Sequence, residues 1–398
     1  MAEEKKRNTN LTLLEKIDII KNKKLFPLIF SVSVLSIISI LFGILTGGRF
    51  FGRTVLTGIF QQSIIVGVVS IGASFIYSTG DVDFSVGNVM GLAAALGALS
   101  YQQSQSVVAM IAVTIMAALM LMLFNCTLSV IFKVKSAMVA IVAMTLYGAI
   151  TIELVGANPI AVDYKICRTL ENGWFRYATF ISFVIASLVI YHLTPLGRKL
   201  RFIGGNETCS KQTGISSMKS KYLAFVVTGI GVGLGGVYTI IRSGSVANTA
   251  GNGMGMDVML AVVLGGMSLF GGARSNACSG FIGAMTVTAL NKGLLMVGVE
   301  SSIIQGVRGL LFLLLVFMNS ERQLTALFEK LPLDHPARAP FNLFAQASDT
   351  VRSGIVLGLG TRLQVLQNEA VRNIISRSDI DLTAPGRRKC AYFVILSD

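Results

Sequence analysis

Three oxygen-bearing side chains, Asp81, Asp83 and Ser85, directly precede an apolar run of the sequence. Carboxylate and hydroxyl oxygens at the start of a helix accept hydrogen bonds from its unpaired backbone N–H groups and favour its positive dipole end. The same oxygens suit sugar hydroxyls where a broken helix points its end at a solute path. The sequence therefore predicts helix capping, a lining of a translocation pathway, or both.

Charged side chains also lie inside apolar stretches, at Glu153, Lys292 and Arg308. A charge is costly in lipid, so such residues usually face a cavity or a partner. Alternatively, the segments end earlier than expected and the side chains reach the membrane interface. Together with Asn291, which precedes Lys292, and the three residues at 81–85, they form the candidate translocation pathway.

The sequence carries no signature of catalysis, metal binding or nucleotide binding. Its two histidines, His192 and His335, are isolated, and its five cysteines are widely separated without metal-ligand or redox spacing. The glycine run Gly229–Gly236 lies in an apolar segment rather than in a βαβ unit, so we expect it to allow close helix packing rather than to bind phosphate. No phosphate-binding G-x-x-x-x-G-K-[ST] motif occurs. We therefore expect no cofactor, no metal and no enzymatic activity, and any ATP hydrolysis must belong to another subunit.

A basic, hydrophilic stretch of about 25 residues, Gly197–Lys221, separates two strongly apolar segments. A transporter driven by a separate ATPase needs a cytoplasmic projection of this kind. We expect a short helix at Glu207–Gln212 to sit in a groove of the ATPase, so that closure there moves the membrane helices. The alternative is a solvated positive loop that only fixes orientation.

The composition indicates that lipid surrounds most of the elements that position these residues. Hydrophobic residues make up 53% of the 398 residues and charged residues only 14%. Apolar runs long enough to cross a bilayer recur along the chain. The sequence predicts an all-α polytopic membrane protein of about ten transmembrane helices, near 26–46, 54–78, 85–101, 107–132, 137–156, 178–195, 222–241, 257–272, 276–298 and 301–318. The third and eighth are short and rich in glycine, which is typical of broken helices.

The distribution of basic residues predicts that both termini are cytoplasmic. With the amino terminus inside, sixteen lysines and arginines fall on the cytoplasmic side and six on the other. The net charge of +14 is therefore assigned to loops rather than to nucleic-acid binding. Residues 1–25 mix basic and acidic residues and read as a cytoplasmic lead-in rather than a signal peptide.

The chain changes character after residue 320. Pro332, Pro336 and Pro340 punctuate a polar stretch, and nothing beyond them is long and apolar enough to cross a bilayer. We therefore predict a transmembrane domain at 26–320, a linker at 321–340 and a short soluble tail at 341–398.

Four motifs, in order along the chain, resemble those of the ribose-type ABC sugar permease family. Gly80–Gly87 (GDVDFSVG) is similar to the family's GGIDLSVG. Residues 204–207 (GGNE), followed by residues 213–215 (TGI), are similar to its GGNE-x-A-x-x-SGI loop. Residues 261–272 (AVVLGGMSLFGG) resemble AVVLGGTSLFGG, and residues 290–294 (LNKGL) resemble LNNGL. The resemblance covers about residues 26–320, with Asp81 in place of a glycine, Cys209 in place of an alanine and Lys292 in place of an asparagine.

The resemblance implies a permease that imports a monosaccharide or related polyhydroxy solute across the bacterial inner membrane. Its expected partners are a cytoplasmic ABC ATPase, an extracytoplasmic solute-binding protein and a second permease copy. The loop that would couple to the ATPase comprises Arg198, Lys199, Arg201, Gly204, Gly205, Asn206, Glu207, Thr213, Gly214 and Ile215.

Two other functions remain open on the sequence. An ion-coupled secondary carrier would use intramembrane charges such as Glu153 instead of a partner ATPase. A DNA-transfer component is suggested only by the tail, because residues 341–398 resemble an internal fragment of the coupling ATPases of type IV secretion. That fragment lacks both nucleotide motifs, and a basic tail could equally touch anionic lipid.

Overall fold

The computed structural model describes residues 26–268, 271–272, 275, 279–300 and 303–313. The chain forms two compact units, Met1–Asn319 and Ser320–Asp398, and only the first contains described residues. The predictions for the lead-in at 1–25, the linker at 321–340 and the tail at 341–398 therefore lie outside the described residues.

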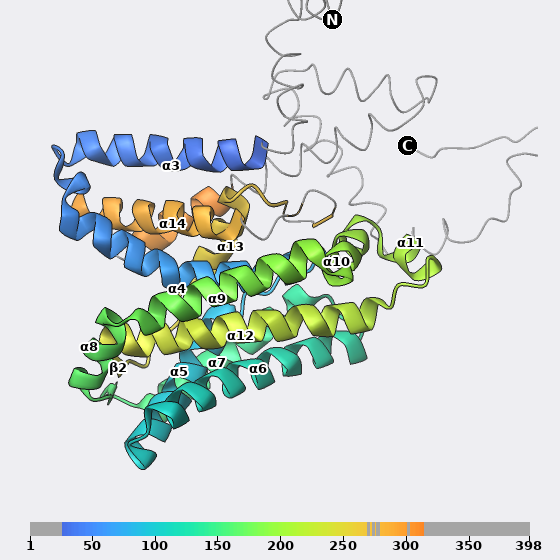
Figure 1. Cartoon of the computed structure of the whole chain (residues 1–398), viewed down its shortest axis with the longest axis horizontal. Coiled ribbons are helices and arrows are strands. Elements are labelled where there is room, and N and C mark those ends of the chain that lie inside the picture. Colours follow the sequence, from blue (N-terminus) through green and yellow to red (C-terminus); the bar gives the residue numbers. More distant parts are fainter. Residues whose placement is uncertain (1–25, 269–270, 273–274, 276–278, 301–302, 314–398) are drawn as a thin grey trace, which may run out of the picture. The chain divides into compact units, whose positions relative to one another are not determined.

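The described part of the chain is a bundle of long helices joined by short connections (Figure 1). A two-residue antiparallel ladder, β1 (Ile160–Ala161) with β2 (Ser245–Val246), is the exception among these residues. The long helices are α3 (Phe26–Leu45), α4 (Arg53–Ser78), α5 (Val86–Ser104), α6 (Val107–Ile131), α7 (Ser136–Val155), α9 (Trp174–Leu188), α12 (Ser217–Ser243) and α14 (Ser279–Met296), and α13 (Met254–Leu264) is a short apolar helix. The shorter helical elements are η1 (Arg49–Phe51), α8 (Tyr164–Asn172), η2 (Val189–Leu193), which continues α9, α10 (Pro195–Gly205), α11 (Glu207–Gln212) and a last apolar helix, Ile303–Leu313.

The structure confirms the predicted all-α polytopic class. Five described helices are long and apolar enough to cross a membrane, namely α4, α6, α7, α9 with η2, and α12. Further apolar helices at both ends of the described chain are shorter, so the number of ten spans stays a prediction. The small β1–β2 ladder and the helix α8 were not predicted.

The eighth predicted segment ends earlier than expected. Helix α13 stops at Leu264 instead of near residue 272, because Gly265 and Gly266 follow and Gly266 adopts a φ of 90°, which breaks the helical path. This segment is therefore short, as predicted. The third segment is not broken, since α5 runs over 19 residues without interruption.

The centre of the bundle is formed by α4 and α12. In the apolar windows of these two helices 83% and 72% of residues are buried, against 22% for α6. Helix α12 packs against α6 on one side and α4 on the other, and α4 packs on to α14, which contacts α3. Figure 1 shows α8 and β2 at one end of this bundle and α10 and α11 at the other. We call these the α8 end and the α11 end.

Glycines of α12 allow this close packing, as predicted. A Cβ added to Gly233 would lie 2.7 Å from Cα of Ile115, and one added to Gly229 would lie 2.9 Å from Cα of Leu119, both on α6. Towards α4, the Thr228 hydroxyl donates to the carbonyl oxygen of Gly72 at 2.9 Å. Helices surrounded by lipid associate through such packing and interhelical hydrogen bonds rather than through hydrophobic gain.

We predict that Gly233→Val lowers the free energy of unfolding by about 1–3 kcal/mol, because the added atoms meet backbone that must move. The matched control is Gly58→Val on α4, where no atom lies within 4 Å of the added Cβ; its effect should stay within roughly 0.5 kcal/mol. Thermal unfolding of the detergent-purified protein measures both. Equal melting temperatures for the two variants would show that the close α6–α12 contact does not limit stability.

Candidate functional site

The basic stretch between α9 and α12 is not an open loop, because it folds into two helices. Thr194 caps α10 by accepting a hydrogen bond from the N–H of Leu196, and Pro195 occupies the first turn, where a missing N–H is tolerated. Arg198 and Lys199 on α10 are exposed. Arg201 is half-buried instead, since its guanidinium stacks 5.4 Å from the Tyr191 ring centroid. Of the three basic side chains on α10, only Arg198 and Lys199 are therefore available to a partner.

Helix α11 confirms the predicted short helix at Glu207–Gln212, and local hydrogen bonds explain the motif around it. The side chain of Asn206 accepts from the N–H of Cys209 at 3.0 Å, which caps the first turn. At the other end Gly214 adopts a φ of 78°, with its N–H bonded to Lys211 and the N–H of Ile215 bonded to Ser210. This is a Schellman ending, which requires a left-handed residue and hence favours glycine.

The two glycines before α11 have different surroundings. A Cβ on Gly204 would lie 2.1 Å from the Ser78 carbonyl oxygen and 2.7 Å from the N–H nitrogen of Gly272, whereas no atom lies within 4 Å of a Cβ on Gly205. The N–H of Gly272 donates to the same Ser78 oxygen at 3.3 Å. Gly204 thus seats α10 directly against the end of α4 and the 271–272 turn, while Gly205 faces open space.

Glu207 ties α11 to the first turns of α12. Its carboxylate accepts from the Ser217 hydroxyl at 2.9 Å and pairs with Lys211 at 3.2 Å and with Lys221 at 3.8 Å. Burial alone would raise the pKa of Glu207, but the Ser217 hydrogen bond and the two lysines together hold the pKa below its ordinary value. The side chain therefore stays ionised at neutral pH, as the ion pairs require.

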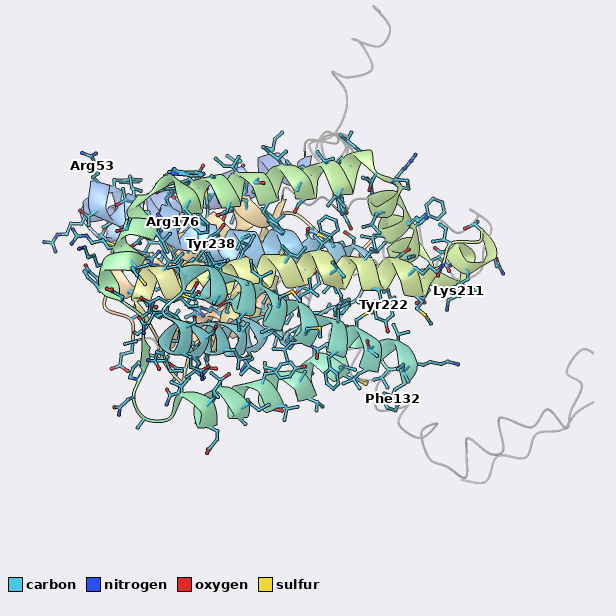
Figure 2. All side chains as sticks on the ribbon, turned by 60° about the horizontal axis from the view of Figure 1, so that its bottom comes forward. Arg53, Phe132, Arg176, Lys211, Tyr222 and Tyr238 are labelled. Atoms are coloured by element: carbon cyan, nitrogen blue, oxygen red, sulfur yellow. The ribbon has the colours of Figure 1, made fainter. Side chains whose placement is uncertain are left out.

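Asp81 faces the α11 end of the bundle and pairs with Lys221. The carboxylate lies 2.9 Å from Nζ of Lys221 and also accepts from the Thr79 hydroxyl at 3.1 Å. Both charged side chains are largely sheltered, with 17% of Asp81 and 19% of Lys221 exposed. Lys221 therefore stands between Asp81, in the connection from α4 to α5, and Glu207 on α11. Figure 2 shows Tyr222, the residue after Lys221, and Lys211 of α11 at the end opposite Arg53 and Arg176.

Asp83 and Ser85 are fully buried and belong to a hydrogen-bonded chain. Asp83 accepts from both the N–H and the hydroxyl of Ser85, at 2.8 and 2.6 Å. Ser85 precedes α5, and its side chain makes no capping hydrogen bond to the helix, so the predicted capping is not what the structure shows for Ser85. The Asn125 amide donates to the Ser85 hydroxyl at 2.8 Å, and the Tyr147 hydroxyl donates to Asn125 at 2.7 Å. The chain links the start of α5 to α6 and α7. The role of Asp83 and Ser85 in a solute path stays a prediction.

A second polar cluster joins α13, α14 and the helix Ile303–Leu313. The Nε–H group of Arg308 lies 3.1 Å from an Asp257 carboxylate oxygen and donates to the amide oxygen of Asn291 at 3.0 Å. The Asn291 amide is 3.5 Å from both Asp257 oxygens. The Nη groups of Arg308 have no hydrogen-bond partner among the described residues. One of them lies against Gly253, where an added Cβ would be 3.3 Å away.

The two remaining predicted pathway residues lie apart from these clusters. Glu153 is exposed in the last turn of α7, towards the α8 end. Lys292 is exposed on α14, next to Asn291. Neither has an ion pair among the described residues. Their position in the pathway stays a prediction.

Three residues of these clusters were missed by the sequence reasoning. Asp257 was overlooked because it was placed at the start of a segment, yet a carboxylate beside an apolar run is the same signal that selected Asp83. Lys221 was counted only as a basic residue of the loop. Phe202 on α10 is 59% exposed and places an apolar ring at the α11 end. No sequence pattern pointed to it.

Residues 55–316 match the model of a known protein family. More than half of the chain lies in this match to the family described as "Branched-chain amino acid transport system / permease component". The chain belongs to this permease family. The ribose import permease protein RbsC of Escherichia coli (strain K12) is 28% identical over 318 residues, covering 77% of this chain and 95% of that protein.

Other relatives of this permease have similar identities. RbsC of Bacillus subtilis (strain 168) is 29% identical over 67% of this chain and 85% of its own length. The fructose import permease protein FrcC of Rhizobium meliloti is 28% identical over 77% and 89%. No solved structure matches the chain. The resemblance to ribose-type permeases is confirmed, and the permease is a multi-pass membrane protein.

We predict that Gly204→Ala destabilises the permease by about 1–3 kcal/mol, because its new methyl group would overlap the Ser78 carbonyl. Gly205→Ala is the neighbouring control and should be tolerated, since its Cβ meets nothing within 4 Å. Thermal unfolding and the yield of folded permease measure both. Equal sensitivity of the two glycines would contradict the packing of α10 on the end of α4.

Proposed function

We propose that this permease subunit imports a monosaccharide or a related polyhydroxy compound, driven by ATP that a partner subunit hydrolyses. Its relatives RbsC and FrcC, which match most of this chain, are named as ribose and fructose import permeases. The observation that carries the solute class is the cluster of Asp257, Asn291 and Arg308 inside a lipid-embedded domain. Carboxylate, amide and guanidinium groups form directional hydrogen bonds with hydroxyls.

A branched-chain amino acid is the second candidate solute, because the family description names it. An amino acid of that kind presents an aliphatic side chain beside one ammonium and one carboxylate group, so its site needs a mainly apolar wall. The Arg308 cluster offers hydrogen-bonding groups from three separate elements instead. This chemistry favours a solute with several hydroxyls.

The α11 end provides the surface for the ATPase. Arg198 and Lys199 are exposed there. Two apolar side chains are exposed as well, Phe202 on α10 and Met218 at the start of α12, which precede and follow α11 in the sequence. An apolar anchor bordered by charges is typical of energetically important protein contacts. Basic residues gather at this end, which supports a cytoplasmic orientation for it. The α8 end would then receive the solute-binding protein.

Two further partners complete the proposal. Outward faces of α6 and α7 are apolar and exposed within a single copy, as expected for surfaces that meet lipid or a second permease copy. The ATPase and binding protein would act from opposite ends of this pair.

We predict that the double charge reversal Arg198→Glu with Lys199→Glu, or the single change Glu207→Lys, lowers uptake roughly tenfold, a coupling loss of about 1.4 kcal/mol. The permease should still insert and fold, because Arg198 and Lys199 are exposed. The control is the charge-preserving exchange Arg198→Lys with Lys199→Arg, which leaves both exposed side chains basic. Uptake and ATP hydrolysis in proteoliposomes measure the effect. Uptake equal to wild type in the charge-reversed variants would refute the coupling surface.

We predict that Arg308→Lys raises the KM for uptake by about tenfold, since a lysine cannot offer the two Nη groups alongside the Asp257 pair. Asp257→Asn should act in the same direction by releasing the Arg308 side chain. Arg53→Lys, an exposed and distant change of the same kind, is the control. Transport of radiolabelled D-ribose and D-fructose measures KM. A fall in the maximal rate alone, with unchanged KM, would assign the cluster to structure rather than recognition.

A further inference from the structure

Lys221 occupies an unusual place between two carboxylates of different elements. It lies in the second turn of α12, and its ammonium group is 2.9 Å from Asp81 and 3.8 Å from Glu207. Asp81 belongs to the connection between α4 and α5, whereas Glu207 begins α11. One cation thus joins the proposed ATPase-contacting helix to the start of a helix in the centre of the membrane domain.

The two ion pairs differ in how easily they separate. The pair with Asp81 is short and sheltered, with less than a fifth of either side chain exposed. Glu207 is 44% exposed and keeps the Ser217 hydroxyl and Lys211 as alternative partners, so it can leave Lys221 without losing all its hydrogen bonds. Leaving a sheltered charge unpaired is far more costly than loosening an exposed one. Lys221 is therefore anchored on Asp81, and Glu207 is the movable partner.

The connection that holds Asp81 leads directly into the buried network of the bundle. Asp81 accepts from Thr79 at the end of α4, and two residues further on Asp83 accepts from the N–H and the hydroxyl of Ser85, the residue just before α5. From Ser85 the hydrogen-bonded chain continues through Asn125 to Tyr147 on α7. A displacement of Asp81 is thus resisted by, and passed to, α5, α6 and α7.

We propose that Lys221 is a positioning residue for energy coupling: through Asp81 and Glu207 it transmits movement of α11 to the α4–α5 connection. The inference rests on the proposed function, because it takes α11 as the part that the ATPase moves. It also concerns this chain in particular, since Asp81 stands where the motif of ribose-type permeases has a glycine, which could form no such pair.

The test uses the whole complex, purified with the ATPase and solute-binding protein that accompany it and reconstituted in liposomes, with ATP as the probe. The variants are Lys221→Met, Asp81→Gly, both together, and the exchange Asp81→Lys with Lys221→Asp. Lys219→Met is the matched control, because Lys219 is exposed two residues before Lys221 on α12 and its side chain makes no ion pair among the described residues. The readout is the ratio of ATP hydrolysis with and without the binding protein.

We expect Lys221→Met and Asp81→Gly each to lower this ratio by about tenfold, or to a value near one where the wild-type ratio is itself below ten. The double variant should be no worse than either single change. The exchange should recover at least half of the wild-type ratio. A purely structural role would lower both rates together and leave the ratio unchanged. A wild-type ratio in Lys221→Met, or no recovery in the exchange when that protein is folded, overturns the proposal.

Cys209 separates this failure from a failure of the proposed function. It is exposed on α11, so a thiol-directed cross-linker attached there reports whether α11 touches the ATPase. If the wild-type complex forms no cross-link, the coupling surface itself is wrong. If the cross-link forms and Lys221→Met keeps a wild-type ratio, only the role of Lys221 is wrong.

Discussion

The close crossing of α4 and α12 is the contact on which the other features depend. A Cβ on Gly72 would lie 3.2 Å from Cα of Thr228, and one on Gly231 would lie 2.9 Å from the Val68 carbonyl oxygen. Lipid offers no hydrophobic gain for helix association, so these small residues and the Thr228 hydrogen bond supply the attraction. Because α4 ends just before Asp81 and α12 begins just before Lys221, this crossing also brings the two charges together.

The polar groups of the bundle divide according to how completely they are bonded. Asp83 and Ser85 are fully buried, and through one Asp83 oxygen, Ser85 and Asn125 they are tied to α6 and α7, so they act as part of the scaffold; the other Asp83 oxygen has no hydrogen-bond partner among the described residues. Arg308 is held by one nitrogen and keeps other donors available, which suits recognition of a solute. At the α11 end, Glu207 is 44% exposed and has Ser217 and Lys211 as alternative partners, which suits movement. Burial and the number of unused donors, rather than charge alone, distinguish these three roles.

Family membership explains the frame of the permease, while its departures explain what is particular to it. The motif around α11 consists of residues that local geometry demands, with Asn206 as the cap, Gly214 in the left-handed conformation and Gly204 against the end of α4. A protein that folds α10 and α11 in this way needs the same residue types at these positions. Asp81 differs, because nothing in the local backbone requires a carboxylate there. Its oppositely charged partner, Lys221, lies far along the chain, on α12.

The sequence alone determined the features that depend on neighbours along the chain. It predicted the lipid-embedded helical class, the glycine-mediated packing of α12 and the helix at Glu207–Gln212, because hydrophobicity, caps and turn residues act within a few positions. It did not reveal the pairing of Asp81 with Lys221 or of Asp257 with Arg308, and it extended α13 past its glycine break. Those pairs join residues far apart in the chain, and only the register of packed helices decides which side chains face each other. A charge that looks like loop solvation in the sequence becomes a sheltered ion pair once tertiary contacts exclude water from it.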